Sequence, residues 1–156
     1  MRGISTKELF PYILEDDRGL PSEQQTIFYI KPKTGHEANI QTKVYLKAFR
    51  EKDNGIRDLI VKDADIADLT NFKATVKKIE NFAFPDDYYE DHPQVKEKAK
   101  PVKIHEDGQE LKILFVKEIT SEDMIGDVCR TLDNDSLREI YDVSRSVSKL
   151  REGQKK

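Results

Sequence analysis

The sequence predicts an α+β protein, with one small mixed or antiparallel sheet, about four helices, and a β-hairpin before the two C-terminal helices. Three observations support this fold class. A run of β-branched and aromatic residues over 26–31 is typical of a strand. Two apolar runs enclose a Glu-Asp-Gly turn at 106–108, as in a hairpin, and other segments repeat apolar residues at the three-to-four spacing of helices.

The length and composition predict a single domain over residues 1–156 with a modest core. Hydrophobic and charged residues each make up 37%, so the chain is poorer in apolar residues than an average globular domain. Such a chain has long solvated segments or completes its core against a partner. The net charge of −3, with both signs mixed, argues against a basic nucleic-acid surface over the whole domain.

The single cysteine, Cys129, excludes an intramolecular disulfide and a Cys-based zinc cluster. Its apolar neighbours Ile125 and Val128 predict a buried structural thiol inside a helix. The sequence contains no apolar run of signal-peptide length and no stretch near the roughly 20 residues of a membrane span. We therefore expect the protein to act in the cytoplasm.

An N-terminal arm is predicted over residues 1–24, because this stretch has little regular pattern and contains an acidic, turn-prone segment. The apolar residues Phe10, Tyr12 and Ile13 are candidates for docking the arm.

The strand over 26–31 follows the arm. Its alternation places Phe28 and Ile30 on one face and Ile27 and Tyr29 on the other. Because both faces are largely apolar, we expect other parts of the protein to cover the strand on both sides, or one face to contact another subunit.

A helix is predicted over 36–51, since Thr34 can cap it and an Asp-Asn-Gly stop follows at 53–55. Residues 56–62 then predict a second strand, whose charged side chains suit an edge position.

The main core helix is predicted over 65–84, because one apolar stripe follows helical spacing and Pro85 ends it. The stripe consists of Ile66, Leu69, Phe72, Val76, Ile79 and Phe82.

Residues 86–100 predict a mobile charged loop, because the sequence DDYYEDHPQVKEKAK has neither helical nor strand period. Tyr88 and Tyr89 are its candidate contact residues.

The hairpin is predicted from strands over 102–105 and 111–116. Leu111, Ile113 and Phe115 alternate along the second strand, and Leu114 and Val116 lie between them, so this strand is expected to be mostly buried.

Thr120 or Ser121 is placed to cap a helix that runs to Leu132. An Asp-Asn-Asp break at 133–135 separates it from the last helix, which Gly153 is placed to close.

The sequence predicts no catalytic, cofactor-binding or metal-binding residue. His36, His92 and His105 lie on three different segments, and none has a second ligand at the spacing of a zinc helix. A phosphate loop and a nucleophile elbow are also missing. The acidic cluster at 86–91 lacks the spaced loop with a central glycine that calcium sites use, and is interpreted as solvated.

Four stretches of the chain resemble small proteins encoded in the structural-gene modules of tailed bacteriophages. They read EDDRGLPSEQQT, IFYIKPKTGHEAN, VKKIENFAF and DNDSLREIYDVSRSVSKLREGQKK. The resemblance implies a non-enzymatic virion or assembly protein, either a head–tail or tail component or a tail-assembly chaperone. It implies other phage structural proteins, or further copies of the chain, as partners, and a location in the bacterial host cytoplasm during assembly or in the virion.

The resemblance implies neither a cofactor, nor a membrane, nor a small-molecule substrate, and nucleic acid is not expected as a partner. The candidate partner-contact residues are Phe10, Tyr12, Ile13, Phe28, Ile30, Tyr88 and Tyr89. The alternative is a regulatory or host-directed binding module that contacts nucleic acid through Lys77, Lys78 and the C-terminal tail.

Overall fold

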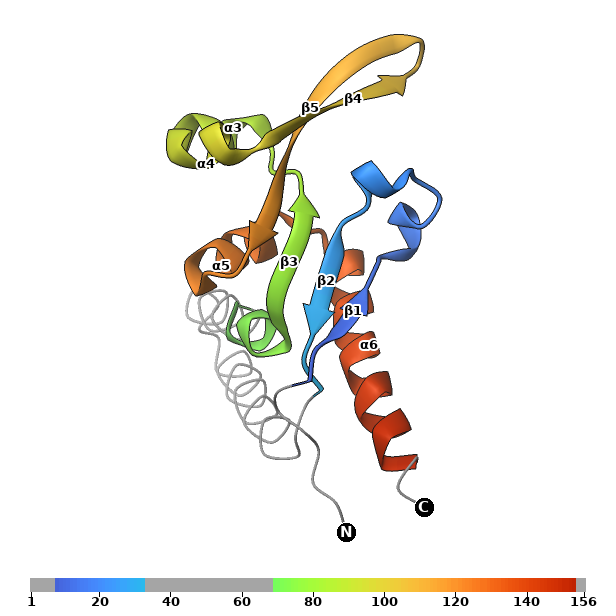
Figure 1. Cartoon of the computed structure of the whole chain (residues 1–156). Helices are drawn as coiled ribbons and strands as arrows, with labels where there is room; N and C mark the ends of the chain where they lie inside the picture. The colour runs from blue at the N-terminus through green and yellow to red at the C-terminus, as the bar shows by residue number, and fades with distance from the viewer. Residues whose placement is uncertain (1–7, 33–68, 154–156) are drawn as a thin grey trace, which may run out of the picture.

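The computed structural model of the protein describes residues 8–32 and 69–153. Its centre is a five-stranded sheet with the order β1-β2-β3-β5-β4 (Figure 1), in which every neighbouring pair is antiparallel. The strands are β1 (Phe10–Tyr12), β2 (Ile27–Ile30), β3 (Val76–Phe82), β4 (Lys100–Glu106) and β5 (Gln109–Ile119). The predicted α+β class is therefore confirmed. The helix predicted over 36–51 and the strand predicted over 56–62 lie outside the described residues.

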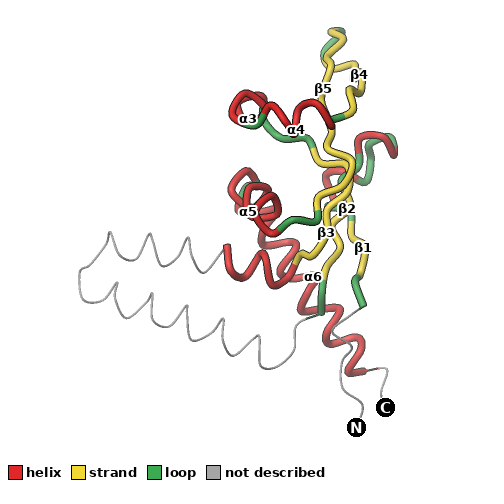
Figure 2. The backbone as a smooth tube through the Cα atoms, turned by 60° about the vertical axis from the view of Figure 1, so that its left-hand side comes forward, coloured by secondary structure: helices red, strands yellow, loops and turns green. Residues whose placement is uncertain are grey.

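Helices cover one face of this sheet. Residues 69–75 are helical, and together with α5 they lie on the same side of the strands (Figure 2). The α-helices are α3 (Asp86–Asp91), α4 (Pro93–Lys98), α5 (Glu122–Thr131) and α6 (Asn134–Gly153), and the 3-10 turns are η1 (Glu15–Asp17) and η2 (Ser22–Gln24).

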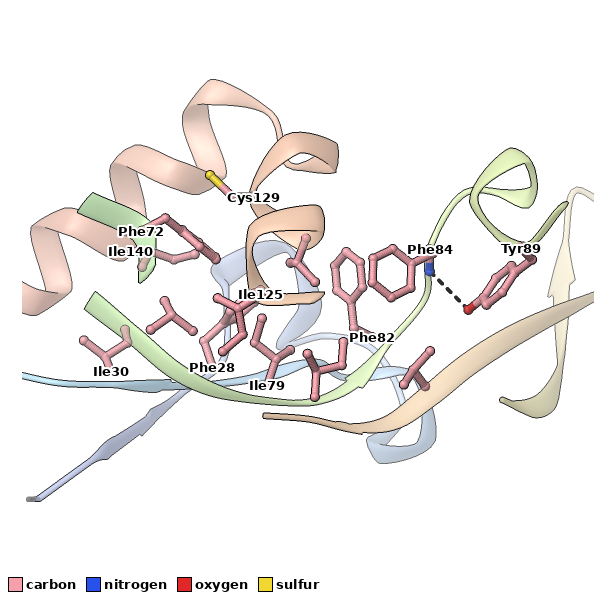
Figure 3. Close-up of a cluster of buried hydrophobic side chains, with 14 residues drawn as sticks. Phe28, Ile30, Phe72, Ile79, Phe82, Phe84, Tyr89, Ile125, Cys129 and Ile140 are labelled. Atoms are coloured by element: carbon pink, nitrogen blue, oxygen red, sulfur yellow. Dashed lines mark hydrogen bonds between the residues drawn. The ribbon is translucent and has the colours of Figure 1, made fainter. Parts of the chain in front are cut away.

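The core lies between the sheet and these helices (Figure 3). Phe28 and Ile30 of β2 face it, as the alternation predicted, and both are almost completely buried. Burying such side chains is the main favourable term in folding, at roughly 1.5–3 kcal/mol each. The other buried apolar residues of this cluster are Phe72, Val76, Ile79, Phe82, Phe84, Tyr89, Val116, Ile119, Ile125, Val128, Cys129 and Ile140.

The prediction of one helix over 65–84 is wrong beyond residue 75, since Val76–Phe82 forms β3. Val76, Ile79 and Phe82 are buried at three-residue spacing, which imitates a helical stripe. The register with β2 slips by one residue between Tyr29 and Ile30, so β3 contains a bulge at Lys77. This bulge keeps Val76 and Ile79 on the core face of the strand.

Asn81 makes the second irregularity of β3. Its φ of 59° lies in the left-handed region, where asparagine is tolerated better than most residues. Its side-chain amide donates to the carbonyl oxygens of Glu23 and Gln25, at 2.7 and 2.9 Å, and its own carbonyl accepts from the Thr26 hydroxyl. The turn at Asn81 allows Phe82 to return to the core face.

The prediction of a loop over 86–100 is also wrong, because the segment forms α3 and α4 before β4 begins at Lys100. Both helices are only six residues long, too short to reveal a helical period in the sequence. Proline begins α4 at its first position, where the missing N–H costs nothing.

The hairpin and the two helices after it are confirmed. The Ser121 side chain caps α5 by accepting from the Met124 amide, and Asp133 accepts from the Ser136 amide at the start of α6. Cys129 is buried in α5, as predicted. Gly126 allows α5 to approach the 69–75 helix closely, because a Cβ there would lie 2.9 Å from the Lys73 side chain.

Candidate functional site

The β4–β5 hairpin projects from the body of the molecule (Figure 1). Asp107 and Gly108 form its two-residue turn, with φ of 52° and 75°. Positive φ at both positions is the signature of a type I′ turn, whose twist matches that of the flanking strands. The turn fixes the register, so that Glu106 pairs with Gln109 and the ladder continues to Lys100 and Phe115.

This register gives the hairpin one apolar face. Cross-strand partners and residues two apart share a face of the ladder. The apolar hairpin face consists of Val102, Ile104, Leu111, Ile113 and Phe115.

Exposure increases along this face toward the tip. Val102 and Phe115 at the base are only 9% and 5% exposed, whereas Leu111 near the tip is 40% exposed. Ile104 and Ile113 are half-buried. The expectation that the second strand is mostly buried is therefore wrong for its distal half. Among the five residues of the apolar hairpin face only Leu111 is exposed, so the face opens to solvent toward the tip.

A buried tyrosine anchors the base of the hairpin to α3. The Tyr89 hydroxyl donates to the Leu114 carbonyl of β5 at 2.8 Å. It also accepts from the Phe84 amide at 3.3 Å (Figure 3). The ring of Tyr89 also meets Phe84 edge-on, at 6.1 Å between centroids. This α3 side chain therefore connects β5 with the segment between β3 and α3.

A stack of three rings continues from this anchor toward solvent. Phe84 stacks on Tyr88 at 3.8 Å between centroids, and Tyr88 stacks on the exposed His92 at 4.1 Å. The Tyr88 hydroxyl donates to Asp127 of α5 at 3.0 Å. Burial, and then this hydrogen bond and the charge of Asp127, raise the pKa of Tyr88 above its ordinary value. Tyr88 thereby joins α3 to α5.

A groove of about 480 Å³ lies beside the base of β4, between that strand and the segment that leads into β2. Lys100 and Lys103 line one wall, while Glu23 and Glu80 contribute to the rest. Open space therefore flanks the first half of β4.

The sheet face away from the core is polar and internally paired around Lys78. The Lys78 ammonium lies 3.2 Å from Glu80 and 3.6 Å from Glu118, and it sits 5.1 Å from the centre of the Tyr29 ring. Tyr29 also donates to Glu80. Two carboxylates thus surround one of the two lysines proposed for nucleic-acid contact, which disfavours a phosphate there.

The structure divides the predicted contact residues into two groups. Phe28, Ile30 and Tyr89 are 1%, 0% and 4% exposed and belong to the core, so they offer no surface in the folded chain. The remaining residues of the set, Phe10, Tyr12, Ile13 and Tyr88, retain exposure but do not form one patch with the hairpin tip.

The N-terminal arm is part of the fold through Tyr12. Its hydroxyl donates to Glu139 of α6 at 2.9 Å and accepts from Arg18 at 3.1 Å. Phe10 pairs with Ile30 at the edge of the sheet and is 41% exposed. Tyr88 of the charged segment instead contacts Asp127 of α5.

Sequence reasoning missed Ile104, Leu111 and Ile113 as surface residues. Their alternation was visible, but alternation alone places residues on one face and does not say whether another element covers it. The structure shows β5 with eleven residues against seven in its neighbour β3, whereas the sequence predicted this strand over 111–116. The sequence therefore contained no signal for the exposed distal half.

Within the residues that the structure describes, no group of three metal-ligating side chains is placed to hold an ion. None of the helices in the same residues is both long enough and apolar enough to cross a membrane. Comparison of the chain with protein-family models, with curated proteins and with solved structures gave no match.

Proposed function

We propose that the protein is a non-enzymatic structural or assembly protein of a tailed-phage particle, acting through protein–protein contacts made by its projecting hairpin. It would be a head–tail or tail component or a tail-assembly chaperone, present in the bacterial host cytoplasm during assembly or in the virion. The observation that carries the proposal is the apolar hairpin face, which is buried at Val102 and Phe115 and becomes exposed at Leu111 near the tip.

Apolar surface that stays exposed to water on an anchored element is unfavourable in free energy and does not stabilise the fold. Leu111 is 40% exposed at a position where a polar residue would serve the strand equally well. Covering this side chain in a complex would regain part of roughly 1.5–3 kcal/mol. The anchor through Tyr89 holds the face in one orientation, which reduces the entropy lost on binding.

The phage setting is supported by the resemblance of EDDRGLPSEQQT, IFYIKPKTGHEAN, VKKIENFAF and the C-terminal stretch to proteins of tailed-phage structural modules. A projecting hairpin suits this setting, because particle proteins join neighbours through extended elements that add to other sheets.

Mass spectrometry of purified particles tests the virion version of the proposal, which expects the chain among the particle proteins. Affinity purification of the chain during assembly tests the chaperone version, which expects a particle structural protein bound to it. The proposal would be refuted if the chain is absent from particles and no particle structural protein is recovered with it by affinity purification.

A further inference from the structure

β4 has an unpaired outer edge among the strands that the structure describes, because it is the last strand in the sheet order. It is seven residues long, whereas β1 at the opposite edge has three residues and contains Pro11. A long edge strand presents a row of backbone N–H and C=O groups to which another strand can add. Beside Lys100 and Lys103 this strand borders a groove of about 480 Å³, whose far wall includes Ser22, Glu23 and Gln25 of the same chain.

The charges along β4 complement those of the same strand running in the opposite direction. Lys100 stands at its beginning and Glu106 at its end, and they share a face with Val102 and Ile104. An antiparallel pair of β4 strands centred on Lys103 sets Lys100 of each copy opposite Glu106 of the other. It also sets each Val102 opposite an Ile104. Opposite charges and apolar pairs at directly facing positions both stabilise antiparallel strands.

The centre of this pair is Lys103 facing Lys103 of the second copy. Within one hairpin the Lys103 ammonium lies 3.5 Å from a Glu110 carboxylate oxygen. Lys103 also faces Lys112 across its own ladder, so the joined sheet sets four lysines in one row, and the two Glu110 carboxylates offset only part of their repulsion. Lysines and Pro101 on the edge discourage pairing with an arbitrary strand, so this edge favours a partner with matching acidic residues.

We propose that a second copy of this chain adds to the outer edge of β4, forming a two-fold dimer through antiparallel pairing of the two β4 strands. The inference rests on the proposed function, since it names one of the protein contacts that the hairpin makes. The two-fold axis is perpendicular to the joined sheet. Both apolar hairpin faces therefore lie on the same side of the joined sheet. The dimer thus doubles the apolar surface offered to further partners.

The test is the mass of the purified full-length chain, measured by light scattering over a concentration series. The unmodified chain is expected to reach twice the chain mass. Lys100→Glu alone and Glu106→Lys alone each set like charges opposite one another at two places in the dimer. Each is expected to weaken dimerisation about tenfold or more.

Mixing the two variants in equal amounts is expected to restore the dimer. In the mixed pair, each changed residue faces an opposite charge, because the Lys100→Glu chain is acidic and the Glu106→Lys chain basic at both positions. Lys117→Glu and Glu97→Lys make the same charge changes at exposed residues outside β4, and both control chains are expected to dimerise as the unmodified chain does.

Three results would each overturn the inference: an unmodified chain that is monomeric at every concentration, a dimer that both charge changes leave unaffected, or a mixture that stays monomeric. A monomeric chain that still enters particles would refute the dimer alone. A dimer formed by a chain that is absent from particles and assembly complexes would refute the proposed function alone.

Discussion

Two neighbouring tyrosines, Tyr88 and Tyr89, show how single side chains position the hairpin. Their rings meet nearly edge-on, yet their hydroxyls serve different elements. Tyr89 reaches the Leu114 carbonyl of β5, and Tyr88 reaches Asp127 of α5. The pair therefore fixes α3 between the base of the hairpin and the helical layer.

Replacing Tyr89 by phenylalanine is expected to destabilise the protein by about 1–3 kcal/mol, because it leaves the buried Phe84 amide and the half-buried Leu114 carbonyl without their shared partner. Urea-induced unfolding measures the loss. The matched control is Tyr29→Phe, whose hydroxyl bonds to Glu80 on the polar face of the sheet. That change is expected to cost less than about 1 kcal/mol, because water can replace the bond. Equal losses for both variants would contradict the anchoring role.

The raised pKa of Tyr88 leads us to expect that the protein loses stability at alkaline pH. Its pKa in the folded protein lies above the ordinary value of 10.0, so the folded state keeps the phenol proton to higher pH than the unfolded state does. The stability that this group contributes is fully present below pH 10.0 and is lost as the pH rises toward the folded pKa.

Tyr88→Phe is therefore expected to cost about 1 kcal/mol near neutral pH and to reduce the loss of stability above about pH 10. Unfolding free energies of both proteins, measured from neutral pH into the alkaline range, check this. If the two proteins lose stability equally steeply above that pH, Tyr88 does not carry the effect.

At the scale of elements, the sequence and the structure agree where the local pattern is regular. The hairpin turn and the cap of α5 each depend on neighbouring residues. The turn lies within the predicted 106–108 segment, and Ser121 is one of the two residues predicted as the cap. β3 was not, because its bulge at Lys77 and the left-handed Asn81 are stabilised by pairing with the distant β2 segment. That pairing is invisible in the strand's own sequence.

The candidate site was only partly predictable for the same reason. The sequence identified apolar alternation over 111–116, but this pattern does not show that Leu111 stays 40% exposed while Phe115 is buried. Conversely, Phe28 and Ile30 had the composition of a contact surface and are covered by helices from other parts of the chain.

Asn81 gives a test of the bulged strand. Asn81→Ala removes two side-chain hydrogen bonds. It also leaves alanine at a φ of 59°, where a residue with a Cβ is strained and no side-chain hydrogen bond offsets the strain. Asn81→Gly removes the same bonds but is free of the left-handed penalty of roughly 1 kcal/mol. Thermal or chemical unfolding is expected to rank the glycine variant about 1 kcal/mol more stable than the alanine variant. An alanine variant as stable as the glycine variant would argue against the left-handed conformation.

At the scale of the whole molecule, the core stabilises the fold and the projecting hairpin offers surface for binding. The helical layer buries one face of the sheet, while the other face is occupied by the Lys78 network. The distal hairpin contributes little to that core and offers both an apolar face and an open strand edge. We therefore expect changes at the tip to alter association without altering the stability of the fold.

The central claim is that the apolar hairpin face binds the protein's partners, and a comparison of two leucines tests it most directly. Leu111 on this face and Leu20 outside it are both 40% exposed, so their replacement by aspartate makes matched changes in surface and charge. The measurement is the amount of each variant recovered with purified particles or with the assembly complex. We expect Leu111→Asp to be largely lost and Leu20→Asp to be retained, with unfolding free energies of both within about 0.5 kcal/mol of the unmodified chain. Equal recovery of the two variants would contradict the claim.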